Sequence, residues 1–301
     1  MPVRQLRRLE APTAHSFHAI LSREALSYAW AARETDAIPA THPELIIERD
    51  GNLLTALPGE PSRLAYSYES DAAFVDLFPA MFDQLLPRLR KARGAGTVRF
   101  RLALGSSRSA VEPVLRTLSF TPQEPWLTFS LARRNATAKI ATKGVTFRPG
   151  DAADLDAIVR VEREAFPDTP MPASAYRQRI ASGEQLLIAI VGGEVAAFAL
   201  HSYDGVDEGY LSVLAVADEF RGRRIGPALT MRVAKWAFAS GADHLALRAE
   251  ERNGTGIKVY RGLGFKHTGS GTDYERPTDP RVIAAMKKAG EGTLIRFGGW
   301  R

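Results

Sequence analysis

The residues best suited to chemistry lie between Leu211 and Leu229. An apolar run from Leu211 to Val216 favours a strand and leads into a basic turn from Arg221 to Gly226. A helical pattern follows, with apolar residues at Ile225, Leu229, Val233 and Trp236. A strand that passes through such a turn into a helix start gathers free backbone N–H groups and the positive end of the helix dipole, which suits a phosphate. The sequence therefore predicts a phosphate-binding turn built from Arg221, Gly222, Arg223, Arg224, Ile225 and Gly226.

A second strand-to-helix stretch follows downstream. The short apolar run Leu245 to Ala249 precedes Asn253, which is a good helix N-cap. Apolar and aromatic residues then recur at helical spacing at Ile257, Tyr260 and Leu263, and Gly264 ends the helix. The dinucleotide motif Gly-x-Gly-x-x-Gly and the nucleoside triphosphate motif Gly-x-x-x-x-Gly-Lys-Ser/Thr are both absent, so neither of those ligands is favoured.

Together these stretches resemble the GNAT superfamily of acetyl-CoA-dependent N-acyltransferases. The family's pyrophosphate loop reads Arg/Gln-x-x-Gly-x-Gly/Ala, here Arg221-Gly-Arg-Arg-Ile-Gly226, and its later motif, Asn-x-x-Ala-x-x-x-Tyr-x-x-x-Gly-Phe, matches Asn253 to Phe265. Three residues depart from the pattern: Arg224 replaces the first loop glycine, Gly256 a small alanine, and Asp218 a common proline. We treat Arg224 as a tolerated variant that keeps ordinary helical dihedrals at the helix start.

The resemblance implies acetyl-CoA as co-substrate. An acetyl thioester is already activated, so the enzyme need only position it, present a neutral amine and protonate the departing thiolate. No metal or covalent nucleophile is required. A chain with six scattered histidines, no cysteine and no metal-ligand spacing agrees with this expectation, and no metal site is predicted.

The resemblance also implies roles for individual residues. We expect the backbone of Leu214, Ala215 and Val216 to splay away from the next strand and to bind the amides of the pantetheine arm, as a peptide adds to a sheet. Tyr260 corresponds to the tyrosine that the family places beside the thioester, and we assign it as the general acid; a plain core tyrosine is the alternative. Asn253 could bind the cofactor near the pantetheine, or it could only cap its helix.

The general base is less determined. Glu208, Tyr210 and Ser212 are two residues apart, so they point to one face of the strand that leads to Leu214. Several family members carry a catalytic glutamate at the position of Tyr210. We assign Glu208 as the candidate base, acting through water. His201 and a chain of waters are the alternatives, and Glu208 could instead be a solvated carboxylate at the strand end.

The first half of the chain parallels the second. Asp50-Gly51 is a strong hairpin turn between apolar runs, as Gly192-Gly193 is later. Apolar positions recur at an offset of 144 or 145 residues, as in Met81 and Ile225, or Phe100 and Leu245, which indicates a duplicated unit. The first copy has lost the site residues: Leu115 stands opposite Tyr260, Arg108 opposite Asn253, and Leu77-Phe-Pro-Ala80 opposite the phosphate turn.

The predicted fold is therefore α/β (α+β), with two GNAT-like domains in tandem, each a mixed, mostly antiparallel twisted sheet flanked by helices. Residues 1–135 form a degenerate copy without a cofactor site, 136–144 a polar linker, and 145–277 the catalytic domain. Amphipathic helices are expected over residues 151–166 and 173–182, which in the family border the acceptor site. Residues 278–301 form an extension with a short helix (280–288) and a terminal strand, for which no role is predicted.

Composition bounds the class of protein. With 301 residues, 45% hydrophobic and 25% charged, the chain suits a globular protein of two domains. It has no apolar run of about 20 residues, no signal peptide at the N-terminus and no cysteine, so we expect a cytoplasmic protein without a membrane partner. The net charge of +6 is dispersed apart from the phosphate turn, which disfavours nucleic acid as a partner.

The sequence thus predicts an acetyl-CoA-dependent N-acetyltransferase that acylates a primary amine by direct attack in a ternary complex. The acceptor would be a small molecule or a peptide, and the protein a monomer or homodimer. Two alternatives stay open. One is a non-catalytic acyl-CoA-binding or sensor protein, because fold does not fix function. The other is a small-molecule acetyltransferase of the mycothiol synthase type, which the two-copy layout also resembles.

Overall fold

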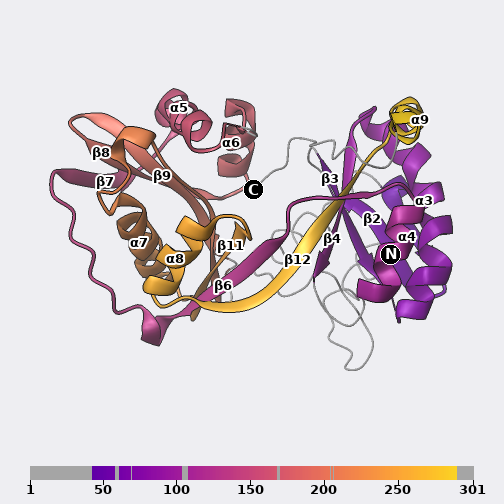
Figure 1. Cartoon of the computed structure of the whole chain (residues 1–301), viewed down its shortest axis with the longest axis horizontal. Coiled ribbons are helices and arrows are strands. Elements are labelled where there is room, and N and C mark those ends of the chain that lie inside the picture. Colours follow the sequence, from indigo (N-terminus) through magenta and orange to yellow (C-terminus); the bar gives the residue numbers. More distant parts are fainter. Residues whose placement is uncertain are drawn as a thin grey trace. The chain divides into compact units, whose positions relative to one another are not determined.

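The computed structural model describes residues 43–57, 61–68, 70–103, 108–167, 170–203, 205 and 207–289. Within these ranges the chain divides into two compact units (Figure 1). Unit 1 comprises residues 43–125 and 270–289, and unit 2 comprises residues 126–269.

Unit 1 is built on a mixed sheet in the order β1-β2-β3-β4-β12. Its strands are β1 (Ile46–Arg49), β2 (Asn52–Leu57), β3 (Ser62–Ser67), β4 (Thr97–Ala103) and β12 (Lys266–Pro277), and the short β5 (Thr121–Pro122) also pairs with β12. The β3–β4 pair is parallel and the others are antiparallel. The predicted hairpin at Asp50-Gly51 is confirmed: both residues have positive φ (50° and 76°), as a type I′ turn between right-twisted strands requires.

Helices cover one face of this sheet and enclose an aromatic core. They are α3 (Asp71–Arg93) and α4 (Arg108–Thr117); a 3-10 turn, η2 (Pro43–Leu45), precedes β1 and α9 (Pro280–Ala289) follows β12. Ser70 caps α3, accepting a hydrogen bond from the backbone N–H of Ala73 at 3.1 Å. The core rings lie 4.4–6.5 Å from their neighbours and belong to Tyr66, Tyr68, Phe74, Phe78, Phe82, Phe100 and Phe120.

Unit 2 has a sheet in the order β6-β11-β10-β9-β8-β7. The strands are β6 (Trp126–Ala132), β7 (Val145–Pro149), β8 (Gln185–Val191), β9 (Glu194–Tyr203), β10 (Glu208–Val216) and β11 (His244–Glu250). Only the β10–β11 pair is parallel. The helices are α5 (Leu155–Ala165), α6 (Ala173–Ala181), α7 (Ile225–Ala239) and α8 (Gly254–Gly262), with 3-10 turns η3 (Arg133–Asn135), η4 (Ala152–Asp154) and η5 (Asp218–Phe220).

The helices of unit 2 lie on both faces of its sheet. Figure 1 shows α5 and α6 on one face and α7 and α8 on the other. The backbone of β10 approaches α7 closely at Gly209, where an added Cβ would lie 2.5 Å from the Cβ of Ala237. Only glycine permits this approach. Apolar side chains of both helix layers form one core around the sheet, so the strands that carry the site are held from both sides.

The two units exchange equivalent strands. β6 lies in the first half of the sequence but pairs antiparallel with β11 in unit 2, while β12, from the second half, pairs antiparallel with β4 in unit 1. β6 and β12 correspond at the 145-residue offset, since Phe129 matches Tyr274. The compact units therefore differ from the contiguous segments 1–135 and 145–277 in the placement of these two strands.

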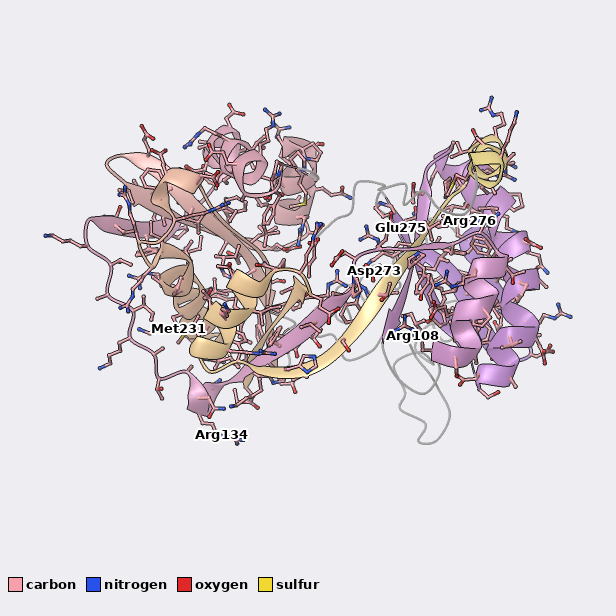
Figure 2. The ribbon with its side chains drawn as sticks, in the orientation of Figure 1. Arg108, Arg134, Met231, Asp273, Glu275 and Arg276 are labelled. Carbon is pink, nitrogen blue, oxygen red and sulfur yellow. The ribbon has the colours of Figure 1, made fainter. Side chains whose placement is uncertain are left out.

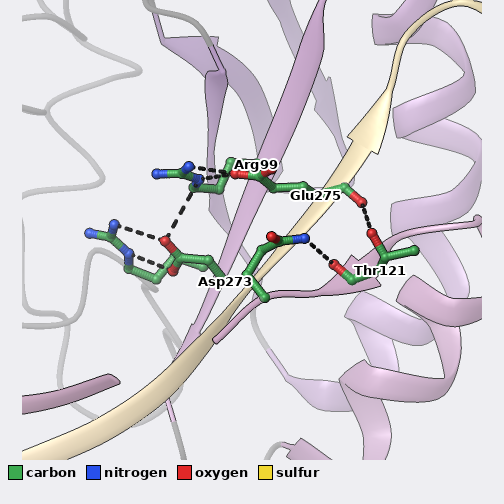
Figure 3. A network of polar contacts seen from close by, with 6 residues as sticks. Arg99, Thr121, Asp273 and Glu275 are labelled. Carbon is green, nitrogen blue, oxygen red and sulfur yellow. Dashed lines mark hydrogen bonds and ion pairs between the residues drawn. The ribbon is translucent and has the colours of Figure 1, made fainter. Parts of the chain in front are cut away.

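A buried network of charges joins β12 to β4 (Figure 3). Asp273 and Glu275 both lie on β12 (Figure 2), where they pair with Arg101 and Arg99 of β4. Arg99 Nε donates to Glu275 Oε1 at 2.7 Å, and Arg101 Nε donates to Asp273 Oδ1 at 3.0 Å. The hydroxyl of Thr121 donates to the backbone carbonyl of Glu275 at 3.1 Å. Arg99 is 4% and Glu275 0% exposed. A shift of the strand register would leave these charges buried without partners, which would strongly destabilise the fold, so the pairs favour the observed register.

The predicted fold class is confirmed: each unit is a mixed, mostly antiparallel sheet flanked by helices. The helices predicted over 151–166 and 173–182 are present as η4 with α5 and as α6. Residues 136–142, in the expected linker, contain neither helix nor strand. The strand expected near the C-terminus lies outside the described residues. No helix in the described ranges is long and apolar enough to span a bilayer.

Candidate active site

Strands β10 and β11 separate in the middle of the unit 2 sheet. Their parallel pairing joins Glu208–Leu211 to His244–Leu247. Beyond this point β10 continues to pair with β9, and β11 with β6. Ser212 is the extra residue of a β-bulge, because Leu211 pairs with His201 and Val213 with Leu200. The sheet therefore opens into a gap that begins at Ser212, and the residues predicted to splay, Leu214 to Val216, form one edge of it.

The basic turn lies at the end of β10. After Val216 the chain forms η5 and then the segment Arg221–Arg224, and α7 begins at Ile225. The first N–H groups of a helix have no partner within the helix, and a 15-residue helix adds a dipole whose positive end is here. Gly226 is half-buried, and an added Cβ would lie 3.6 Å from Val216 and 3.9 Å from Leu214. Residues of the turn and of the gap edge are thus in reach of one ligand.

The conformation of Arg224 corrects an expectation. The sequence predicts ordinary helical dihedrals, whereas the structure places Arg224 in the left-handed region, at φ 60° and ψ 17°. It therefore keeps the backbone shape of the glycine that it replaces. A residue with a Cβ is strained there by about 1–2 kcal/mol. Gly222 has positive φ as well, at 78°.

We expect Arg224→Gly to raise the free energy of unfolding by about 1 kcal/mol, because glycine adopts this conformation without strain. Urea denaturation followed by circular dichroism measures the change. Arg223→Gly is the matched control, since Arg223 is not among the residues with positive φ, and it should be neutral or destabilising. A less stable Arg224→Gly protein would contradict the strain.

The three arginine side chains of the turn are exposed. Arg221 forms an ion pair with Asp218 (2.7 Å), and the guanidinium of Arg223 lies 5.2 Å from the ring centroid of Phe220. Exposed pairs of this kind contribute little to stability. The guanidinium groups are therefore available to a polyanionic ligand at the turn.

Tyr260 lies on α8 with its ring packed inside unit 2. The ring centroid is 6.3 Å from that of Phe129 and 5.8 Å from that of Phe265, and the residue is 8% exposed. Burial raises the pKa of the Tyr260 phenol to about 12. The phenol is therefore protonated at neutral pH, which is the state that a general acid needs.

Asn253 caps α8, as its sequence position predicts. Its Oδ1 accepts a hydrogen bond from the N–H of Gly256 at 2.9 Å. An added Cβ on Gly256 would lie 2.7 Å from Asn253 Nδ2, so the glycine leaves room for the capping side chain in this conformation. Capping is thus observed, and a contact with the cofactor stays a prediction.

Glu208 is not brought to the gap. Its Oε2 lies 2.6 Å from His244 Nε2, and the residue is buried at the beginning of β10. Ser212, where the gap begins, is four residues away, which is about 13 Å along a strand. This distance disfavours Glu208 as the general base, and water chains of that length would be needed to connect it.

His201, the other candidate base, packs under α7. Its ring meets that of Trp236 edge to face, with centroids 4.4 Å apart, and burial lowers the pKa of the imidazole to about 4. The folded state therefore binds a proton less readily than the unfolded state. Stability from this effect is fully present above pH 6.5 and is lost as the pH falls toward 4.

We expect His201 to reduce the free energy of unfolding by up to about 3 kcal/mol between pH 6.5 and pH 4, since each pKa unit corresponds to 1.36 kcal/mol. Chemical denaturation across this range measures the slope. His201→Leu should flatten it, while His267→Leu, which changes an exposed histidine of β12, should not. Equal slopes for the wild-type and His201→Leu proteins would refute the assignment.

A polar cluster beside the gap was missed by sequence reasoning. Arg179 of α6 binds Glu184 through two hydrogen bonds (2.8 and 2.9 Å), and the hydroxyl of Ser212 donates to Glu184 Oε2 at 2.8 Å. Gly183, at φ 99°, reverses the chain between α6 and β8 so that Glu184 returns over Arg179. The only signal in the sequence is a Gly-Glu pair between a helix and a strand, which does not reveal a partner 28 residues later.

In unit 1 the segments at the corresponding positions have other structures. Leu77–Ala80, opposite the basic turn, lies inside helix α3, so no helix begins there. Leu115, opposite Tyr260, is a fully buried core residue.

Comparison with known proteins agrees with this geometry. Residues 155–265 match the acetyltransferase (GNAT) family. A mycothiol acetyltransferase from Acidothermus cellulolyticus is 25% identical over 293 aligned residues, covering 81% of this chain and 88% of that protein. Two solved structures share the fold. A GCN5-related N-acetyltransferase from Sphaerobacter thermophilus has a TM-score of 0.64 and 16% identity, covering 83% of this chain and 86% of that one. A tandem GNAT protein from the clavulanic acid biosynthesis pathway has a TM-score of 0.65 and 15% identity, covering 93% and 95%.

The sheet opens between two parallel strands, next to the basic beginning of a helix. Together with the family match and the relative, this arrangement supports an N-acetyltransferase-type enzyme. Residues 155–265 thus match the GNAT acetyltransferase family, and the fold of the chain is similar to that of a tandem GNAT protein. The family match implies acetyl-CoA as co-substrate. Within the described ranges, no group of three or more histidine or acidic side chains is arranged to hold a metal ion.

Proposed function

We propose that unit 2 binds acetyl-CoA in the gap between β10 and β11 and transfers the acetyl group to a primary amine by direct attack in a ternary complex. The observation that carries the proposal is the end of the β10–β11 pairing at Leu211, on the same strand that leads into the basic turn. An open strand edge and a helix start in sequence suit a ligand with amides at one end and phosphates at the other.

The turn supplies the contacts for the diphosphate. The N–H groups of Ile225 and Gly226 lie in the first turn of α7, and Arg221, Arg223 and Arg224 add formal charge beside them. Charge-assisted hydrogen bonds of this type are the stronger ones that proteins make to phosphate oxygens. The left-handed conformation of Arg224 supports this reading, because strained residues persist where the surrounding structure fixes them.

The gap edge supplies the contacts for the pantetheine arm. Residues from Val213 to Val216 span about 10 Å of strand. Their backbone pairs with β9 on one side, and on the other side the pairing with β11 has ended at Leu211. An arm that runs from the turn along this edge brings its thioester toward Ser212.

Tyr260 donates the proton that the departing sulfur takes up. Its ring is held between Phe129 and Phe265, so the phenol needs no reorganisation during the reaction. Asn253 fixes the beginning of α8 and thereby the position of Tyr260 seven residues later.

Unit 1 has a structural role in this proposal. Its helix α3 runs through the segment opposite the basic turn, and a buried leucine stands in place of Tyr260. We therefore expect one molecule of acetyl-CoA bound per chain.

A small-molecule acceptor is favoured over a protein acceptor by the relative named as a mycothiol acetyltransferase, which aligns over 81% of this chain. We keep this as the finer form of the proposal. The competing function is an acyl-CoA sensor that binds the thioester without turnover.

Two measurements test the proposal. Isothermal titration with acetyl-CoA should show binding at one site per chain, and thiol release should depend on an amine from a panel of glucosamine, spermidine, cysteine amide and a dipeptide. No heat of binding would overturn the proposal. Binding without thiol release for any amine would favour the sensor.

A further inference from the structure

We propose that Ser212 is the catalytic residue that takes the proton from the attacking amine, and that Glu184, held by Arg179, is the positioning residue that receives the proton from Ser212. The inference rests on the proposed function and names a base for the same site. It begins from the location of the bulge: Ser212 is the first residue of β10 beyond its last pair with β11.

One row of paired residues crosses the sheet at the closed end of the gap. The pairs run from β6 to β8 through Phe129, Leu247, Leu211, His201 and Gln185. Tyr260 packs on Phe129 at one side of the gap, and Ser212 directly follows Leu211 on the other. Phe129 and Leu211 are two strands apart, which is about 10 Å. The proposed acid and the Ser212 hydroxyl therefore both border the point where the gap closes.

The two groups lie on different faces of the sheet. Paired residues point to the same face, and the row faces α7, because His201 contacts Trp236 of that helix. Ser212 faces the opposite side, because its hydroxyl bonds Glu184, which is bound to Arg179 of α6. An amine that approaches from the α5–α6 side can thus attack a thioester in the gap while its sulfur meets Tyr260 from the other side.

Arg179 and Ser212 fix the Glu184 carboxylate in one orientation. Arg179 Nε binds Oε1 at 2.8 Å and Nη2 binds Oε2 at 2.9 Å, and Oε2 also accepts from Ser212. Glu184 is 9% exposed and the Ser212 side chain is half-buried, so the proton path leads from the gap into the protein. A nearby titratable pair, Tyr176 and Glu162, faces the same cluster from α6 and α5.

The proton steps balance. The amine nitrogen bonds to the thioester carbonyl carbon and the carbon–sulfur bond breaks, while Tyr260 gives its proton to the sulfur. The nitrogen loses one proton to Ser212 Oγ as the Ser212 proton passes to Glu184 Oε2. Solvent then reprotonates Tyr260 and removes the proton from Glu184.

The test compares Ser212→Ala with Ser212→Thr, which keeps a hydroxyl, in the full-length protein with acetyl-CoA and the panel amine that the wild-type protein acetylates fastest. Because general base catalysis contributes 10²–10⁴-fold, we expect kcat to fall about 100-fold in Ser212→Ala with unchanged affinity for acetyl-CoA, and to recover most of this in Ser212→Thr. Glu184→Gln should lose as much as Ser212→Ala, and the double variant no more, because the two act as one unit. Ser182→Ala, at the exposed end of α6, is the matched control.

The outcomes separate the two proposals. Wild-type kcat in Ser212→Ala, or equal losses in Ser212→Ala and Ser212→Thr, would overturn the role of Ser212 and leave the acetyltransferase intact. The profile of kcat with pH at saturating amine adds a readout that a structural role would not move: its acidic limb should disappear in Ser212→Ala. A wild-type protein that binds acetyl-CoA but acetylates no amine overturns the transferase and this inference together. If Glu184→Gln fails to fold, the two Ser212 variants carry the test.

Discussion

Tyr260→Phe is expected to lower kcat for acetyl transfer by 100-fold or more, with little change in the affinity for acetyl-CoA. A positioned general acid contributes about 10²–10⁴-fold. The ring of Tyr260 is packed between Phe129 and Phe265, so phenylalanine fills the same space and only the proton donor is lost. Steady-state thiol release gives kcat, and isothermal titration gives the affinity.

Tyr68→Phe is the matched control. Tyr68 is a buried phenol of unit 1 whose hydroxyl donates to Met81 Sδ at 3.6 Å. Removing it should leave kcat unchanged. Full activity in Tyr260→Phe would exclude the phenol as the acid and would leave solvent to protonate the thiolate.

Glu275→Ala is expected to lower the free energy of unfolding by about 3–5 kcal/mol, because it leaves the Arg99 guanidinium in a buried site without its main counter-charge. Asp273 offsets part of the loss, since its Oδ2 lies 3.7 Å from Arg99 Nε. The change should also loosen the last part of β12, which this network holds to β4 (Figure 3). Urea denaturation measures the stability, and amide hydrogen exchange along β12 measures the local effect.

The double variant Arg99→Met with Glu275→Leu distinguishes the loss of the ion pair from the effect of leaving one buried charge without a partner. Replacing a buried pair by apolar residues is often close to neutral, so this variant should be more stable than Glu275→Ala. Arg281→Ala, which breaks an exposed pair with Asp279, should produce no measurable change. A double variant that is as unstable as Glu275→Ala would show that the charges are not the source of the effect.

Local patterns were sufficient for much of the fold. The Asp50-Gly51 and Gly192-Gly193 turns were predicted because such residue pairs tolerate the positive φ that type I′ hairpin turns require at both positions, and all four residues have it. The N-cap at Asn253 and the helix of Tyr260 depend on contacts within four residues, which a sequence shows directly. The separation of β10 from β11 was also expected, because two short motifs of the sequence resemble those of the GNAT superfamily.

Non-local pairing was beyond the reach of these patterns. The sequence of β6 or of β12 is compatible with the last strand of either copy, because the alternation of apolar and polar residues within a strand does not reveal which strand it pairs with. The register in which Arg99 meets Glu275 depends on residues 176 positions apart. The same limit applies to Glu184 and Ser212, which only the chain reversal at Gly183 and the bulge in β10 bring together.

The sequence by itself determined the family resemblance: where the basic turn stands, which strand precedes it and which tyrosine follows it, since each depends on residue type and short spacing. Only the tertiary structure decided that Arg224 adopts a left-handed conformation, that Glu208 lies about 13 Å from the start of the gap, and that the Glu184 carboxylate binds the hydroxyl of Ser212. The reason is physical. A backbone dihedral at a helix start and the distance between two side chains are set by packing and strand register, which are properties of the whole sheet rather than of any one segment.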